Sequence, residues 1–291
     1  MSWLQITLEI DGCDADGVAC VLDASGAISV TTMDAGDEPL LEPAPGETPL
    51  WRQARVVALF DPDINLQRLR EALEVLYPVV VQNLLVEQLD DQDWSNIWRD
   101  SFSSMRFGRR LWVCPSGESC ADPDAVVVRL DPGLAFGTGT HATTAMCLEW
   151  LDAHPPLGCD VVDYGCGSGI LAIAAHKLGA RHVFAVDIDP QALQATRDNA
   201  ERNDIVNGLS VQFPEKFDPG QAGLVIANIL ANPLVELAAR LSGYLESGAS
   251  IIMTGILADQ AEYVMAAYRD AIEFSEPRLQ DGWVLLAGRK R

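Results

Sequence analysis

A glycine-rich segment between a predicted strand and a predicted helix restricts the possible folds of this chain most strongly. Gly165-Cys-Gly-Ser-Gly169 follows Val161-Val-Asp-Tyr164, which we predict to be a buried strand, and precedes an apolar run that begins at Ile170. Glycine tolerates positive φ and lets a ligand approach the backbone, and the first turn of a helix offers free N–H groups. We therefore predict a strand, a tight turn and a helix, with the turn binding a nucleotide-like ligand. A purely structural turn is the alternative.

An acidic residue supports the ligand-binding interpretation. Asp187 follows Gly165 by 22 residues and ends the next predicted strand. In doubly wound sheets, an acidic side chain at this place accepts hydrogen bonds from ribose hydroxyls. The fingerprint of nicotinamide dehydrogenases is Gly-x-Gly-x-x-Gly, whereas the third glycine here, Gly169, comes one residue earlier. The spacing thus favours a methyltransferase over a dinucleotide-dependent oxidoreductase. Asp189 is explained as the N-cap of a helix that starts at Pro190.

Strands and helices alternate over residues 108–291, which we predict to be one catalytic domain. This alternation is typical of a parallel, doubly wound α/β sheet. Asp281-Gly282 suggests the turn of a hairpin that adds an antiparallel edge strand. The expected strands are 111–114, 125–130, 160–164, 182–187, 209–213, 224–227, 250–254 and 283–287, and the expected helices are 141–151, 170–178, 190–203 and two that start near 233 and 258.

Residues 1–90 have a different pattern, which predicts a small α+β domain. Expected strands at 3–10, 27–32, 54–60 and 84–89 and expected helices at 18–22 and 66–76 give the order β-α-β-β-α-β of a ferredoxin-like domain. The segment 37–48 is predicted to be a loop because it is rich in Pro, Gly and Glu. In residues 91–107, apolar residues at positions 94, 97, 98 and 102 fit one helix face and predict an interdomain helix or linker.

The chain is strongly acidic, which bears on its partners. It has 20 basic and 42 acidic residues, a net charge of −22, and residues 1–90 alone contain 16 acidic and 4 basic residues. A surface of this sign repels nucleic-acid phosphates and attracts basic partners. General solubility, or a salt-adapted host, accounts for the charge equally well. We expect a basic protein partner and no direct nucleic-acid binding.

Other patterns favour a cytoplasmic protein without a metal. The seven cysteines are odd in number and include no Cys-x-x-Cys pair, which fits reduced thiols. The apolar runs are too short for a membrane span, and the first residues lack the features of a signal peptide. No cluster of residues suggests a metal site. We expect a cytoplasmic monomer that does not associate with membranes.

Three segments together resemble the ribosomal protein L11 methyltransferase (PrmA) family of class I S-adenosylmethionine-dependent methyltransferases. They are Leu130-Asp-Pro-Gly-Leu-Ala-Phe-Gly-Thr-Gly-Thr-His141, the glycine-rich segment above and Asn228-Ile-Leu-Ala231. Outlying matches at Pro45-Gly-Glu-Thr, Met105-Arg-Phe-Gly and Leu111-Trp-Val-Cys-Pro extend the resemblance over the whole chain. It implies a Rossmann-like, seven-stranded class I methyltransferase domain after the ferredoxin-like domain.

The resemblance also implies roles for particular positions. Thr144, Gly165, Asp187 and Asn228 would contact S-adenosylmethionine, and the small domain, residues 1–90, would recognise the substrate. Members of the family trimethylate lysine side chains and the N-terminal amine of ribosomal protein L11. Gly167, in the glycine-rich turn, is also expected at the cofactor.

Asn228 is the residue that we expect in the catalytic role. It follows an apolar strand at the sheet edge where a ligand crevice should open. Methyltransferases that act on planar amides or bases have an aromatic residue after such an Asn, whereas Ile229 and Leu230 follow here. This difference favours a flexible amine as the acceptor. His141 is the nearest candidate for a general base, but a histidine that holds the loop backbone fits equally well.

The sequence therefore predicts a protein-lysine N-methyltransferase that uses S-adenosylmethionine to modify amino groups of ribosomal protein L11. The alternative is an S-adenosylmethionine-dependent methyltransferase that acts on another basic protein or a small amine. A nucleic-acid acceptor is disfavoured by the net charge of −22. A non-catalytic binding module would retain the glycine-rich turn but would not require Asn228.

Overall fold

The chain forms two compact units in a computed structural model, one of Met1–Trp94 and the other of Ser95–Arg291. Each unit has its own buried core. The structure describes residues 3–36, 51–78, 81, 84–89, 103–118, 122, 124–130, 141–217 and 220–291. The expected loop at 37–48 and residues 91–102 of the expected interdomain helix lie outside these residues.

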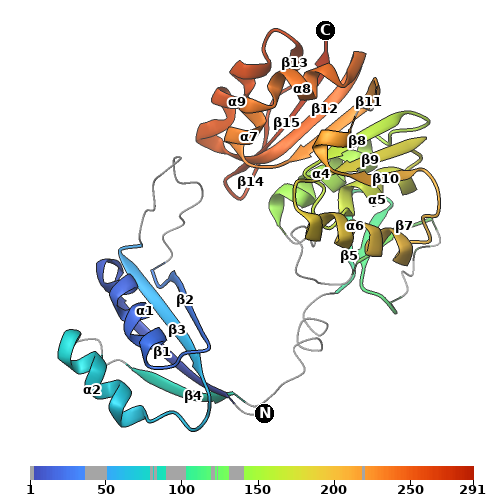
Figure 1. The fold of residues 1–291 in the computed structure, drawn as a ribbon. Coiled ribbons are helices and arrows are strands. Elements are labelled where there is room, and N and C mark those ends of the chain that lie inside the picture. The colour runs from blue at the N-terminus through green and yellow to red at the C-terminus, as the bar shows by residue number, and fades with distance from the viewer. Residues whose placement is uncertain are drawn as a thin grey trace. The chain divides into compact units, whose positions relative to one another are not determined.

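The N-terminal unit is a four-stranded antiparallel sheet with two helices (Figure 1). The strand order β2-β3-β1-β4 places the first and third strands side by side at the centre, as in a ferredoxin-like fold. The predicted fold of this unit is thus confirmed. Its elements are β1 (Trp3–Asp11), α1 (Ala15–Ala24), β2 (Ser29–Asp34), β3 (Gln53–Phe60), α2 (Leu66–Leu76) and β4 (Leu85–Leu89).

One face of this sheet packs against the helices because its residues alternate along the strands. Ile6, Leu8 and Ile10 of β1 are buried with every second residue of β3. Val18 and Leu22 of α1 pack against them in the same core. The alternation fixes the register, since a slip by one residue would expose all of these side chains.

The C-terminal unit is built on a larger sheet, which has eight strands within the described residues. The order is β10-β9-β8-β11-β12-β15-β13, and β14 pairs with the first residues of β15 on the side that β13 occupies further along. The first five strands are parallel, whereas β15 is antiparallel to β12 and β13. These strands are β8 (Asp160–Tyr164), β9 (His182–Val186), β10 (Leu209–Gln212), β11 (Ala222–Asn228), β12 (Leu245–Leu257), β13 (Ile272–Phe274), β14 (Arg278–Gln280) and β15 (Trp283–Lys290).

Helices cover both faces of this sheet, so the strands are apolar on both sides (Figure 1). Val161 of β8 belongs to the core under α4 (Ala142–Ala153), α5 (Ile170–Lys177) and α6 (Pro190–Arg202), and its neighbour Val162 belongs to the opposite core. That opposite core lies under α7 (Ala231–Glu236), α8 (Ala238–Gly243) and α9 (Ala261–Tyr268). The predicted doubly wound fold is confirmed.

A small three-stranded sheet accompanies the α4 and α5 layer. It consists of β5 (Met105–Phe107), β6 (Leu111–Cys114) and β7 (Val126–Arg129). β6 and β7 confirm two predicted strands. The prediction of a helix was wrong at 105–107, since these residues form β5 and pair with β6. The alternating apolar residues Met105 and Phe107 serve the strand, and the turn that follows at Gly108 has φ of +72°.

The end of the described chain corrects one further expectation. Asp281 and Gly282 have φ of +50° and +81° and form the predicted hairpin turn between β14 and β15. However, β15 is not an edge strand, because β12 pairs with one side of it and β13 with the other. The three-residue strand β13 is too short to show a clear sequence pattern.

Candidate active site

A cavity of about 710 Å³ lies where the parallel strands of the large sheet end. Its wall includes Gly165 and Gly167 after β8, Asp187 after β9 and Asn228 at the end of β11. Ligands of doubly wound sheets bind in the crevice outside the carboxyl ends of the strands. Four of the five residues singled out in the sequence therefore line one cavity at the expected edge.

The glycine-rich turn has a backbone that other residues could hardly adopt. Gly165, Gly167 and Gly169 have φ of +81°, +54° and +78°. The N–H groups of Gly165 and Cys166 both donate to the carbonyl of Val186, at 2.7 and 3.1 Å, which ties the turn to the end of β9. A β-carbon on Gly169 would lie 2.7 Å from a methyl carbon of Thr196. The turn is thus closely packed against α6.

Asp187 holds both this turn and the loop that follows β9. One carboxylate oxygen accepts the N–H of Gly167 at 2.9 Å, and the other accepts the N–H of Asp189 at 3.0 Å. Asp189 in turn accepts the N–H of Gln191 at 2.8 Å, so its predicted role as the N-cap of α6 is confirmed. Each oxygen of Asp187 has a further lone pair, and the residue lines the cavity, where ribose hydroxyls could donate to it.

Asn228 and Thr144 lie together, but only Asn228 lines the cavity. The Nδ2 of Asn228 donates to the hydroxyl of Thr144 at 3.3 Å. Thr144 is completely buried in α4, and Thr143 and His141 line the cavity beside it. The contact uses one amide hydrogen of Asn228 and leaves its carbonyl oxygen available as an acceptor. The structure therefore places Thr144 behind Asn228, away from the wall of the cavity.

His141 is the N-cap of α4, which accords with the interpretation of this residue as a backbone anchor. Its Nδ1 lies 2.7 Å from the hydroxyl of Thr143 and also accepts the N–H of that residue at 3.3 Å. The imidazole meets the ring of Trp283 edge to face, with 5.0 Å between the ring centroids. The segment 131–140 before His141, which carries much of the family resemblance, lies outside the described residues.

Several residues in or near the cavity were missed in the sequence, and three of them bear polar or aromatic groups that could act on a ligand. Trp283 at the start of β15 and Glu236 on α7 both line the cavity, although they lie far from any recognised motif. The third is Asp163, inside the strand that precedes the glycine-rich turn. Its position in an otherwise apolar strand was a usable signal, because a carboxyl group is rarely buried without a role.

Asp163 is a fully buried carboxyl group behind the turn. Among the described residues, neither of its oxygens accepts a hydrogen bond by geometry. Burial raises its pKa to about 7, and the charge of Asp187 adds to this rise, while the backbone amide of Ala172 opposes it. The hydroxyl of Thr254 is buried and likewise without a partner within the described residues. Thr254 pairs with Asn228 across β11 and β12, so a second buried polar side chain lies beside a residue of the cavity wall.

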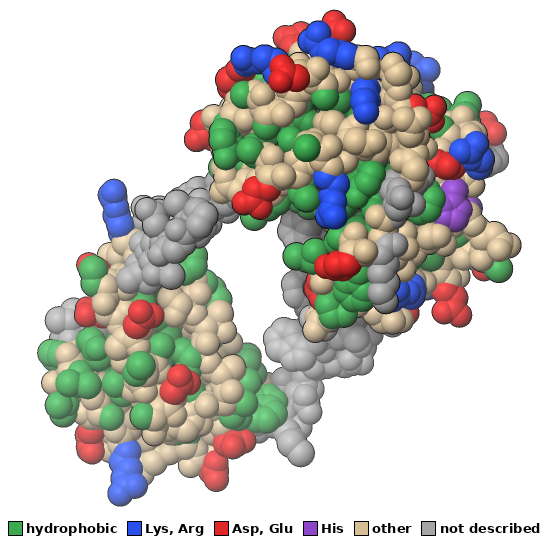
Figure 2. Space-filling view, turned by 45° about the horizontal axis from the view of Figure 1, so that its top comes forward, with side chains coloured by type: hydrophobic (Ala, Val, Ile, Leu, Met, Phe, Trp, Pro, Cys, Tyr) green, Lys and Arg blue, Asp and Glu red, His purple; other side chains and the backbone are tan. Residues whose placement is uncertain are grey.

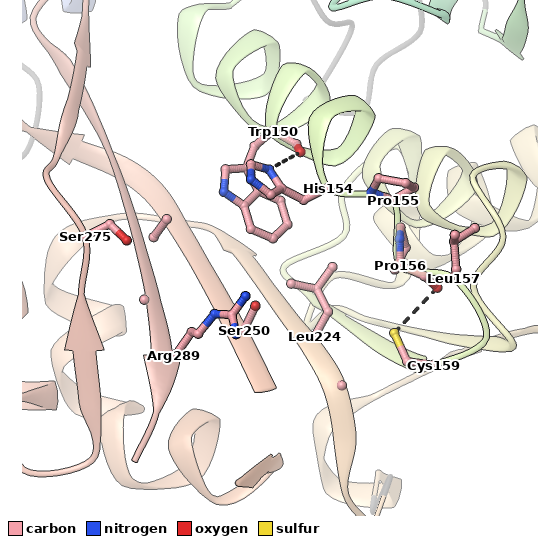
Figure 3. Close-up of a pocket in the computed structure, with 13 residues that line it drawn as sticks. Trp150, His154, Pro155, Pro156, Leu157, Cys159, Leu224, Ser250, Ser275 and Arg289 are labelled. Atoms are coloured by element: carbon pink, nitrogen blue, oxygen red, sulfur yellow. Dashed lines mark hydrogen bonds between the residues drawn. The ribbon is translucent and has the colours of Figure 1, made fainter. Parts of the chain in front are cut away.

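A second cavity, of about 440 Å³, lies at the opposite edge of the sheet (Figure 3). Its wall includes Cys159 before β8, Leu224 at the start of β11 and Arg289 near the end of β15. Trp150 and His154 are stacked on one side of it, with 4.6 Å between their ring centroids. The amino ends of parallel strands are not the edge where doubly wound folds bind their ligands. The cavity beside the glycine-rich turn is therefore the candidate active site.

Two kinds of feature are absent from the described residues. Within them, no three His, Cys, Asp or Glu side chains are arranged to hold a metal ion. No helix in the described part of the chain is both long and apolar enough to span a membrane.

Comparisons with known proteins agree with the resemblance found in the sequence. The family profile described as "Ribosomal protein L11 methyltransferase (PrmA)" matches residues 2–291. Relatives named ribosomal protein L11 methyltransferase include one from Hahella chejuensis, 50% identical over 290 residues, which are 100% of this chain and 99% of the relative. Another, from Ectopseudomonas mendocina, is 49% identical over 292 residues, with both chains covered completely.

A solved structure agrees with both the sequence and the fold. The ribosomal protein L11 methylase from Lactobacillus delbrueckii subsp. bulgaricus superposes with a TM-score of 0.60 at 33% identity, covering 65% of this chain and 100% of that one. The match over nearly all residues, together with the fold and the cavity at the carboxyl ends of its strands, shows that this chain belongs to the ribosomal protein L11 methyltransferase (PrmA) family.

Proposed function

We propose that this chain transfers methyl groups from S-adenosylmethionine to amino groups of ribosomal protein L11, on lysine side chains and the N-terminal amine. The observation that carries the proposal is the match of this chain, over nearly its full length, to the family. Its cavity is lined by the glycine-rich turn, Asp187 and Asn228, which suits the binding of S-adenosylmethionine. We take ribosomal protein L11 as the substrate because the relatives are named for it. The side chains of the cavity suit methyl transfer to an amine.

The residues of the cavity fit S-adenosylmethionine. The ligand has a ribose, for which Asp187 offers carboxylate lone pairs, and an amino-acid part with a positive charge. The carboxyl of Asp163 is buried in the strand before the glycine-rich turn, and it would stabilise positive charge at the site when it is ionised. The cavity wall also has large apolar surface from Ile188, Leu237 and Trp283, as an adenine ring requires. Thr144 would act on the cofactor only through Asn228, whose amide donates a hydrogen bond to its hydroxyl.

When bound, the cofactor supplies a methyl group that its sulfonium already activates. The residues of this chain then have to exclude water and align an amine nitrogen with the methyl carbon, at about 3–3.5 Å and in line with the bond that breaks. Asn228, with its carbonyl oxygen available on the cavity wall, can accept a hydrogen bond from the amine and aim its lone pair. If S-adenosylmethionine bound here, it would supply the methyl group and leave as a neutral thioether, so that the N–C bond formed balances the C–S bond broken and the alkylated nitrogen releases its proton to water.

The amine must be neutral to react, although the ordinary pKa of a lysine is about 10.4. The apolar wall at Leu230, Leu237 and Trp283 favours the neutral amine by desolvation. Glu236 on the same wall attracts the incoming ammonium before it loses its proton. His141 is engaged as a helix cap through Nδ1, so no general base is assigned to it.

We also propose that residues 1–90 recognise the protein substrate. They contain 16 acidic and 4 basic residues, which favours a basic partner. Figure 2 shows Asp and Glu side chains on the visible face of both units. We further propose that the protein is located in the cytoplasm and that it is a monomer. The six described cysteines have free thiols, in keeping with a reducing compartment, and a net charge of −22 repels a second copy.

Mass spectrometry tests the proposed function. Unmethylated ribosomal protein L11 is incubated with the enzyme and S-adenosylmethionine, with a control that lacks the cofactor. We expect mass gains in methyl steps that map to lysine side chains and the N-terminal amine. If the cofactor binds by calorimetry but no mass gain occurs, the proposed substrate is wrong and another basic protein or a small amine takes its place.

A matched pair of variants connects the activity to the cavity. Asp187→Ala removes charged acceptors at the cofactor site, and we expect it to reduce methyl transfer at least tenfold, because a hydrogen bond to a charged group contributes about 1.5–3 kcal/mol. Asp189→Ala, two residues away, removes only the cap of α6 and should leave transfer nearly unchanged below its unfolding temperature. Equal activity of the two variants would contradict the assigned site.

A further inference from the structure

One face of α6 is directed at the glycine-rich turn without lining the cavity. Thr196, Asn199 and Arg202 are spaced three residues apart, so they lie along one side of the helix. Thr196 is completely buried, and Asn199 is 5% exposed. Neither residue lines the cavity, and none of the roles described above involves them. Buried polar side chains in this arrangement require partners.

Their partners are the carbonyl groups of the turn itself. The hydroxyl of Thr196 donates to the carbonyl of Gly167 at 3.0 Å. The Nδ2 of Asn199 donates to the next carbonyl, that of Ser168, at 2.8 Å. Because both donors lie on α6 and outside the cavity wall, these two carbonyl oxygens are directed towards the helix and away from the ligand.

Arg202 determines how the amide of Asn199 is oriented. Its guanidinium donates to the Oδ1 of Asn199 at 2.7 Å. With its oxygen occupied by a cation, the amide presents its NH₂ group to the turn. Thr196 has a second contact, with the thiol of Cys166 at 3.3 Å. Three consecutive residues of the turn, 166–168, are thus held by side chains of one helix.

The turn requires such support because of its composition. Glycine has a wide range of backbone conformations, and Gly167 and Gly169 flank the peptides that accept these hydrogen bonds. If the peptide between Gly167 and Ser168 rotated, the carbonyl oxygen of Gly167 would leave Thr196 and turn away from α6. A carbonyl oxygen directed at the cavity would repel the carboxylate of a ligand, which can only accept hydrogen bonds. The N–H of Gly167 is fixed separately by Asp187, so only the carbonyl side depends on α6.

We propose that Thr196 and Asn199 are positioning residues, which hold the carbonyls of Gly167 and Ser168 against α6 and thereby set the affinity for S-adenosylmethionine. Arg202 contributes by orienting the amide of Asn199. The inference rests on the proposed function, since it assigns these residues to the cofactor turn of the same site. It predicts an effect on cofactor binding from side chains that the cofactor does not touch.

Calorimetric titration with S-adenosylmethionine tests the proposal on the full-length protein. Thr196→Val removes the hydroxyl with almost no change of shape, and we expect the Kd to rise about tenfold, which corresponds to about 1.4 kcal/mol. Thr196→Ser retains a hydroxyl and should restore a Kd within about twofold of the wild type. The KM for the protein substrate should not change in either variant. Asp198→Ala is the control, because Asp198 is exposed on the same helix and its carboxylate accepts a hydrogen bond from the side chain of Gln194 and none from the glycine-rich turn within the described residues.

A purely structural role predicts a different result. Loss of a buried hydrogen bond lowers the stability of the free and bound protein alike, so the melting temperature would fall while the Kd stayed the same. That result for Thr196→Val would overturn the proposal. If this variant does not fold, Arg202→Met is measured in its place, since Arg202 is exposed and its loss should not prevent folding. We expect this variant to bind S-adenosylmethionine about threefold more weakly. An unchanged Kd would refute the positioning role of the α6 side chains. A wild-type protein that binds no S-adenosylmethionine would instead refute the proposed function, and the inference with it.

Discussion

Substitution of Gly255 in β12 tests whether close backbone packing around the cavity is needed for methyl transfer. It lines the cavity, has φ of +84°, and faces the backbone of the residue after Asn228. A β-carbon on Gly255 would lie 2.4 Å from the carbonyl oxygen of Ile229 and 2.8 Å from its carbonyl carbon. Both contacts are with backbone, which cannot rotate away as a side chain can. The Gly255→Ala variant must therefore move the segment that carries Asn228.

The size of the effect follows from this geometry. Relief to an ordinary contact of 3.4 Å needs a shift of about 1 Å, and a displacement of that size at an active site lowers the rate about 100-fold. Positive φ costs alanine roughly 1–2 kcal/mol, and overpacking adds about 1–3 kcal/mol. We expect Gly255→Ala to lower the free energy of unfolding by about 2–5 kcal/mol, a fall in melting temperature of roughly 6–15 °C.

Gly248 is a matched control in the same strand. Its φ is +77°, but a β-carbon there would meet nothing within 4 Å. Gly248→Ala should therefore lose only about 1–2 kcal/mol of stability and retain its rate of methyl transfer. The assays are urea denaturation and initial rates measured well below both melting temperatures. Equal losses of rate in the two variants would refute the argument, because positive φ alone would then explain them.

Two further predictions concern the buried acid and the small unit. Burial raises the pKa of Asp163 from 3.8 to about 7, so between about pH 4 and 7 the folded protein binds a proton that the unfolded chain has released, and stability falls as pH rises through this window. In urea denaturation at pH 5 and 8, Asp163→Asn should show a smaller fall than the wild type; an equal fall would contradict the raised pKa. Deletion of residues 1–90 should spare S-adenosylmethionine binding by calorimetry and abolish methylation of the protein, and retained methylation would exclude the proposed role of these residues.

The fold could largely be predicted because its elements have clear local patterns. β6, β8 and α2 begin and end at the predicted residues. The position of β15 inside the sheet could not be predicted, since it depends on pairing with β13, a three-residue strand. A hairpin turn such as Asp281-Gly282 indicates that the two strands it joins are antiparallel. It does not indicate which further strands pair with either of them.

The site was predictable where a motif also determines backbone geometry. The glycines and Asp187 could be placed because positive φ and a strand end belong to the same local pattern. Trp283 and Glu236 reach the cavity through tertiary packing, which leaves no periodic signal in the sequence. Thr144 was expected at the cofactor, and the structure shows it against Asn228, because its side chain lies on the buried side of α4.

The central place of β15 has a consequence for biosynthesis. Residues 283–290 complete the large sheet between β12 and β13, and Trp283 contributes to the wall of the cavity. Domains generally fold in the order in which the ribosome makes them. The small unit can close as soon as β4 has emerged, whereas the larger sheet retains an open gap until its antiparallel strand has been translated. Ribosome-bound nascent chains that lack this strand should therefore contain a folded N-terminal unit and no competent cofactor site.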